Sequence, residues 1–261
     1  MKTARMMSSE LKYQQLSYWR NPLGAFFTFF MPVMFLVIFG SLYNNQKAPS
    51  ALGVGGAISF DQYFVPAILT LGVISACYTQ LAIQLSNQRD AGLLKRVRSS
   101  PLPPAAYLFT VVLSCLIRTA VLVGITLAVG GLFYGLVFPA HAALALVVVV
   151  GIASVTFSAI GIAITAAIPN ADAAPAIVNG IYLPLMFISG TFFPLSSSSI
   201  LTKIASYFPV RPFVQASFAA LNPLVHGSGI EWHEVGAMVI WCALALVVGV
   251  RCFRWTPARK G

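Results

Sequence analysis

The sequence predicts an all-α polytopic membrane protein with six transmembrane helices. Of the 261 residues, 58% are hydrophobic and only 8% are charged. A soluble domain carries about 25% charged residues, because its surface must meet water. Six apolar runs can each cross the ~30 Å of hydrocarbon at ~1.5 Å per residue of helix. Helix is expected throughout, because an unpaired strand would leave backbone polar groups unsatisfied in lipid.

The expected elements form a single transmembrane domain over residues 1–261. Residues 1–22 are expected to lie as a helix in the membrane interface, with a frayed, solvated N-terminus as the alternative. Residues 194–231 are too polar for an ordinary span and too apolar for a free loop, so short external re-entrant helices are expected there. The six spans are expected at 24–42, 63–86, 105–133, 140–168, 174–193 and 234–254.

The positive residues predict the orientation in the membrane. Lysine and arginine collect in cytoplasmic loops. Of the 16 such residues, 12 lie in three segments, 1–20, 87–100 and 251–260. Both termini and the segment between the second and third spans are therefore expected in the cytoplasm. The same bias accounts for the formal charge of +10, so a nucleic-acid partner is not expected.

The sequence carries few groups for catalysis or metal binding. It has no GxxxxGK[ST] phosphate loop, no HExxH and no GxSxG. Only six acids and three histidines are present, and the four cysteines lie in or beside apolar runs without a CxxC pair. We expect no catalytic residue, no metal site and no bound cofactor in this chain. Its work is expected to be powered by another protein.

The charged segment 88–101 has the pattern of a short amphipathic helix. Leu93, Leu94 and Val97 form an apolar stripe at positions i, i+1 and i+4, opposite a cationic face. Asp90 is expected near the helix N-terminus, where the helix dipole favours negative charge, and Pro101 is expected to end the helix. Such a helix can enter the groove of a partner protein. The alternative is a simple anchor, in which the cations meet anionic lipid.

Polar residues within the spans are candidates for a substrate pathway. Arg118 stands alone in the third span, and a charge at membrane depth marks either a pathway or an ion pair. Equally, its long side chain can reach back to the headgroups. Asn179 and Tyr182 in the fifth span are the other pathway candidates, although helix packing is the ordinary role of polar residues in spans.

Three motifs follow one another along the chain: "YWRNPLGAFFTFFMPVMFLVIFG" at 18–40, "QRDAGLLKRVRSSPLPPAAYLF" at 88–109 and "SGTFFPLSSSSILTKIASYFPVRPF" at 189–213. Taken in this order, they resemble the motifs of ABC-2-type permeases, the membrane subunits of ABC exporters for drugs and lipids. The chain departs from the family pattern at Asp90, where glutamate is common, and at Leu94 and Lys95, where a second acid often follows. The serines at 196–199 are a third departure.

The resemblance implies an exporter in the cell membrane with two separate cytoplasmic ATPase subunits, which bind ATP and Mg. A second copy of this chain, or a homologous permease, would complete the complex. Residues 1–22 would be the elbow helix and residues 88–101 the coupling helix. The docking residues implied are Arg89, Asp90, Gly92, Leu93, Leu94, Arg96, Val97 and Pro101.

Two other classes of membrane protein are alternatives. An ion-coupled secondary transporter would show internal repeats and buried acids, and neither is evident in this sequence. An intramembrane lipid-modifying enzyme would need converging histidine, aspartate or glutamate in the spans. The cargo is expected to be amphiphilic or hydrophobic.

Overall fold

The computed structural model describes residues 2–42, 60–136, 138, 139, 141–191, 200–224, 227–253 and 255. Within these ranges the chain is helical and contains no strand, which confirms the all-α prediction. Parts of the expected elements lie outside the described residues. These are residue 1 of the interfacial helix, residue 140 of the fourth span, 192 and 193 of the fifth, 194–199 and 225–226 of the external region, and residue 254 at the end of the sixth.

Eleven α-helices and one π-helix make up the described chain. The first half holds α1 (Lys2–Trp19), α2 (Pro22–Leu42), α3 (Phe60–Ile74), the π-helix η2 (Ser75–Thr79), α4 (Gln80–Asp90) and α5 (Leu93–Arg98). The second half holds α6 (Pro104–Tyr134), α7 (Ala142–Ile164), α8 (Ala174–Ile188), α9 (Ile200–Ser206), α10 (Val210–Leu221) and α11 (Trp232–Cys252).

Among the described residues, five helical segments are long and apolar enough to cross a membrane. They are Gly24–Leu42, Phe64–Asp90, Pro104–Tyr134, Ala142–Ile164 and Trp232–Cys252. The sixth apolar helix, α8, has 15 residues and is about 22 Å long at ~1.5 Å per residue. Pro184 lies inside α8.

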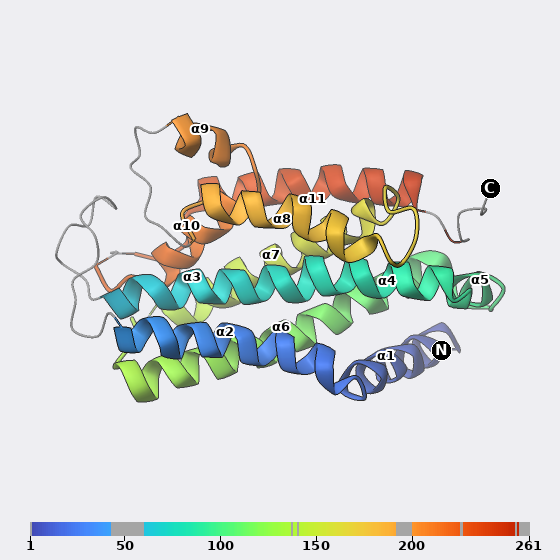
Figure 1. Cartoon of the computed structure of the whole chain (residues 1–261), viewed down its shortest axis with the longest axis horizontal. Helices are drawn as coiled ribbons and strands as arrows, with labels where there is room; N and C mark the ends of the chain where they lie inside the picture. Colours follow the sequence, from blue (N-terminus) through green and yellow to red (C-terminus); the bar gives the residue numbers. More distant parts are fainter. Residues whose placement is uncertain are drawn as a thin grey trace.

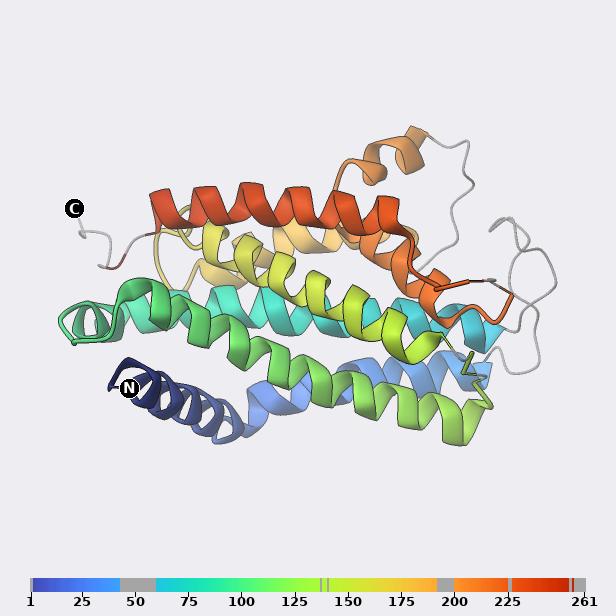
Figure 2. The same ribbon diagram turned by 180° about the vertical axis from the view of Figure 1, so that it is seen from behind.

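The long helices run along a common axis and form one bundle (Figures 1 and 2). The start of α1, the short helix α5 and the C-terminal end of α11 all lie at one end of this bundle (Figure 1). We call it the α5 end. The helix α10 lies at the opposite end.

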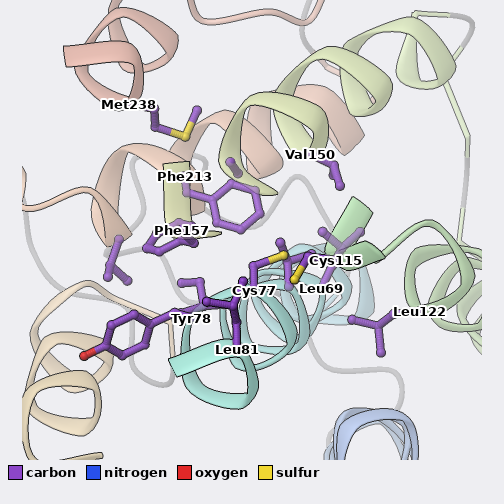
Figure 3. Close-up of a cluster of buried hydrophobic side chains, with 14 of the residues drawn as sticks. Leu69, Cys77, Tyr78, Leu81, Cys115, Leu122, Val150, Phe157, Phe213 and Met238 are labelled. Carbon is purple, nitrogen blue, oxygen red and sulfur yellow. The ribbon is translucent and has the colours of Figure 1, made fainter. Parts of the chain in front are cut away.

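The continuous segment α3–η2–α4 forms the centre of the core. Its residues Leu69, Cys77 and Leu81 are almost fully buried. Figure 3 shows them among side chains from four other helices: Cys115 and Leu122 of α6, Val150 and Phe157 of α7, Phe213 of α10 and Met238 of α11.

The π-helix η2 lies where α7 comes closest to the central segment. Gly161 of α7 makes this approach possible, because a Cβ at that position would lie 3.1 Å from the Cys77 carbonyl oxygen and 3.2 Å from that of Tyr78. A π-turn is a rare break in an α-helix and frequently marks a functional position.

The described part of the external region is packed against the bundle. In α10 the Ser217 hydroxyl accepts a hydrogen bond from Thr70 of α3, with 3.4 Å between the oxygens. The Phe213 ring lies 5.8 Å from the Phe157 ring of α7. The shorter α9 is followed by Tyr207, whose carbonyl oxygen accepts a 2.9 Å hydrogen bond from the Trp241 indole of α11.

The N-terminal helix α1 packs along the first half of α6. The Gln15 amide donates to the Ser114 carbonyl at 3.0 Å, and the Gln14 amide donates to the Thr110 hydroxyl at 3.4 Å. The segment Lys2–Trp19 is therefore a helix that packs on α6 in this structure.

Candidate functional site

A two-residue turn at the α5 end of the bundle connects α4 to α5. The helix α4 ends at Asp90, and α5 begins at Leu93. Between them, Gly92 has a φ of +73°, the left-handed conformation that glycine adopts without a steric penalty. A Cβ at Gly92 would meet nothing within 4 Å, so its backbone conformation alone favours glycine here.

Arg89 and Asp90 attach the end of α4 to the connection between α7 and α8. The Arg89 side chain is only 2% exposed, and its Nη1 donates a 2.9 Å hydrogen bond to the Thr165 carbonyl. Its Nε lies 3.3 Å from Oδ1 of Asp90. The other carboxylate oxygen of Asp90 accepts a 2.6 Å hydrogen bond from the Ala171 backbone N–H. Asp90 thus ends α4, instead of lying at the start of α5 as the sequence suggested.

The helix α5 has a buried side and an exposed side. Leu94 is 1% exposed, and Val97 packs against the core from a half-buried position. Leu93, by contrast, is 38% exposed. The apolar stripe of the sequence is therefore divided between the bundle and the surface. The exposed part, which we call the α5 surface, consists of Leu93, Lys95, Arg96, Arg98 and Pro101.

Local hydrogen bonds hold α5 in place. The Ser100 hydroxyl donates to the Val97 carbonyl at 2.6 Å and accepts from the Leu102 backbone N–H at 3.3 Å. The Tyr107 hydroxyl of α6 donates a 2.9 Å hydrogen bond to the Gln88 side chain of α4. This bond joins the two helices that α5 connects.

Arg118 is buried between α6 and α1. It is 2% exposed, and its guanidinium carbon lies 4.4 Å from the centroid of the Tyr18 ring. Its Nε donates to the Ser114 carbonyl at 3.1 Å, and its Nη2 donates to the Cys115 sulfur at 3.3 Å. Within the described chain it forms no ion pair with a carboxylate. A cation over an aromatic face is attracted by the ring, so Arg118 attaches α1 to the bundle.

Tyr182 and Asn179 lie on α8. Tyr182 is 8% exposed, its hydroxyl donates a 3.3 Å hydrogen bond to the Leu71 carbonyl, and its ring lies 6.2 Å from that of Tyr78. Tyr182 therefore packs on the central segment, while Asn179 is half-buried. Arg118 contacts α1 instead, so these three sequence candidates do not share one set of partners.

Comparison with protein families gives a match over most of the chain. The family model of the ABC-2 type transporter matches residues 8–222. The chain belongs to the ABC-2 type transporter family. No curated protein matches the chain significantly.

The family match confirms the family that the three sequence motifs predicted. The permease is a multi-pass membrane protein, and permeases of this family generally work with ATPase subunits. The family is a transporter membrane component rather than a catalyst itself. In such a protein the exposed, cationic α5 surface is the candidate contact with the ATPase.

The structure also brings together a set of polar residues that the sequence interpretation did not single out. Gln80, Gln84, Asn87 and Gln88 lie on one side of α4 and line a cavity of about 220 Å³ between α4, α1 and α2. Their spacing of four, three and one residues places them on one helix face, and that spacing was the available signal. Gln80, the first of the four, lies inside an apolar run, so a reading by hydropathy does not reveal this polar helix face.

Proposed function

We propose that this permease is the membrane subunit of an ATP-binding cassette exporter that moves an amphiphilic or hydrophobic molecule out of the cytoplasm or inner leaflet. The substrate class comprises drugs, lipids and lipid-linked molecules. Two separate ATPase subunits bind ATP and Mg and supply the energy. A second copy of the chain, or a homologous permease, completes the complex in the cell membrane.

The α5 surface is the observation that carries this proposal. It exposes three cations and one leucine on a short helix at one end of the bundle, beside a glycine turn. A groove with an acidic rim and an apolar floor would complement it in charge and shape. An electrostatic anchor for lipid accounts for the cations but not for the left-handed Gly92 and Pro101 on either side of the short helix.

The positive-inside rule supports a cytoplasmic position for the α5 end. The described N-terminus and the end of α11 lie at the same end as α5 (Figure 1). Both termini and the α5 surface would then face the cytoplasm together, where an ATPase can reach them.

Buried contacts behind α5 link it to the rest of the bundle. Through them, a movement of the ATPase that displaces α5 would also displace the helices behind it. Arg89 and Asp90 bond to Thr165 and Ala171 in the connection that leads to α8. Leu94 lies in the core beneath α5. We therefore assign Arg89, Asp90, Leu94 and Val97 to transmission, and Leu93, Arg96 and Pro101 to contact with the ATPase. Gly92 sets the turn between the two groups.

Co-purification with the cognate ATPase subunit tests this assignment. Leu93→Glu and Arg96→Glu should each release the ATPase, because they oppose the apolar and the electrostatic part of the contact. Lys12→Glu is the matched control, since it makes the same charge reversal at an exposed position of α1. Retention of the ATPase by both α5 variants would exclude the docking role. The purified permease alone should hydrolyse no ATP.

A further inference from the structure

The cavity between α1, α2 and α4 is polar without being charged. Gln80, Gln84, Asn87 and Gln88 line it from α4, and Ser17 and Asn21 line it from α1 and the junction with α2. Leu93, at the start of α5, also lines it. No lysine, arginine, aspartate or glutamate is among the described residues that line it. The four amides span about 12 Å of α4 at ~1.5 Å per residue.

Most of these amides have no partner within the protein. Among the described residues, Gln88 accepts a hydrogen bond from Tyr107, whereas the side chains of Gln80, Gln84 and Asn87 make none. Each free amide offers two N–H donors and a carbonyl acceptor. Three such groups on one wall can bind a ligand that both donates and accepts, as a hydroxyl does.

The absence of charge from the cavity distinguishes it from its surroundings. Four of the 16 cations of the sequence lie in residues 1–20 and four in residues 87–100, the two segments that flank the cavity. An ordinary solvated surface at this end of the bundle would be expected to share this positive charge. An anionic headgroup would likewise be matched by lysine or arginine. The lining therefore favours a neutral ligand.

The cavity lies beside the start of the first span, where headgroups are expected. It reaches Asn21 and Gly24, where the chain passes from the interfacial helix α1 to the span α2. Trp19, just before this junction, is 49% exposed, and tryptophan is typical of membrane interfaces. Tyr13, which also lines the cavity, is 58% exposed and offers a ring face to the C–H groups of a sugar.

We propose that this cavity binds the neutral, hydroxyl-rich headgroup of a glycolipid at the cytoplasmic interface of the permease. The amides of Gln80, Gln84 and Asn87 hydrogen-bond the sugar hydroxyls, and the acyl chains stay in the bilayer beside α2. The proposal rests on the proposed function in one respect, that the α5 end is cytoplasmic. It narrows the substrate class to lipids with uncharged glycosyl headgroups.

Native mass spectrometry of the purified permease measures this binding directly. The probes are diglucosyldiacylglycerol, phosphatidylglycerol and diacylglycerol with the same acyl chains, together with free maltose. The protein is prepared without maltoside or glucoside detergents, because their headgroups would occupy the cavity. We expect the glycolipid to bind at least tenfold more tightly than the other three probes.

Two substitutions test the amides. Gln84→Met and Asn87→Leu keep the side-chain size and remove the hydrogen-bonding groups, so together they should weaken glycolipid binding about tenfold. Gln215→Met on α10, at the opposite end of the bundle, removes an amide that lies between Arg211 and Glu234, away from the cavity. This variant should bind the glycolipid as the unaltered protein does. Diacylglycerol binding should be unchanged in all variants.

Each contrary result overturns a definite part of the proposal. Equal or tighter binding of phosphatidylglycerol would show that charge, not hydroxyl groups, is recognised. Equal binding of diacylglycerol would show an acyl site without headgroup selection, and equal binding of maltose would identify a soluble sugar as the ligand. The comparison of probes on the unaltered protein remains decisive even if a variant fails to fold. No ATPase is needed, so a failure here is distinct from loss of ATPase docking.

Discussion

At the scale of single residues, the most constrained side chains lie at the end of α4. Arg89 is almost completely buried, and its contacts are the Thr165 carbonyl and the Asp90 carboxylate. A buried guanidinium needs such partners, because an unpaired charge in the protein interior is costly. Asp90 supplies the negative charge and also satisfies the Ala171 N–H, so one carboxylate connects α4 to the α7–α8 connection.

Replacing Asp90 by alanine should destabilise the permease. It removes the counter-charge of Arg89 and leaves the Ala171 N–H without its acceptor, at a cost of about 1–3 kcal/mol in the free energy of unfolding. Thermal unfolding of the detergent-solubilised protein measures the effect. Asp172→Ala is the matched control, because Asp172 is an exposed aspartate in the same connection. Equal destabilisation by the two substitutions would contradict a specific role for Asp90.

Sequence patterns could predict the chemistry of these residues but not their partners. Arg89 and Asp90 belong to a cationic segment that separates two apolar runs, so the sequence suggested that both lie at the surface. What buries them is the connection 165–171, which lies some 80 positions away in the chain. Arg118 shows the same limit. A lone arginine in an apolar helix predicts that its charge is paired or reaches the headgroups. Its partner in the structure, Tyr18 of α1, could not be predicted because it depends on tertiary packing.

At the scale of elements, hydropathy located apolar helices, and five of them in the described chain are long enough to cross the bilayer, which sets the length that a span needs. The expected fifth span at 174–193 contains α8, which has only 15 residues. Amphipathicity was less informative for α5. This helix has only six residues, so its apolar stripe cannot show which leucine faces the protein and which faces a partner. The structure separates the buried Leu94 from the exposed Leu93. The π-turn η2 has no comparable sequence signal, since its residues have the composition of any span.

The contact between η2 and α7 predicts that Gly161 is intolerant of a side chain. The Cβ in Gly161→Ala would lie close to two backbone carbonyls that cannot rotate away, so the helices must separate. Overpacking of this kind costs about 1–3 kcal/mol. Gly151→Ala on the same helix is the control, because a Cβ there meets nothing within 4 Å. A shift in unfolding temperature for Gly161→Ala alone is expected. Equal unfolding temperatures for the two variants would argue against close packing at η2.

At the scale of the whole molecule, burial is unevenly distributed over the apolar helices. The central segment Phe64–Asp90 is almost wholly enclosed, whereas the apolar windows of α2 and α11 are mostly exposed. On α8, Leu183 and Phe187 are also exposed. Figure 1 shows α2 and α8 on either side of α3 on the near face, and Figure 2 shows α11 on the far face. Lipid or a second permease must cover these surfaces.

The length of α8 favours the near face as the surface that would meet the proposed second copy. A helix of about 22 Å is shorter than the ~30 Å hydrocarbon layer, so lipid would have to thin around it. A second permease against α2 and α8 would replace that lipid by protein. The longer α11 meets no such mismatch and can face lipid along its length.

Cysteine cross-linking between copies distinguishes the two faces. Cys242 and Cys252, the two native cysteines that are not buried, are first replaced by serine. Phe30→Cys on α2 and Leu183→Cys on α8 should then give a covalent dimer with a short bis-maleimide in membranes, whereas Val247→Cys on α11 should remain monomeric. All three side chains are exposed in the single chain, so accessibility alone predicts equal labelling and cannot produce this pattern. A dimer formed through Val247→Cys alone would place the second copy on the α11 face, with α8 turned toward lipid.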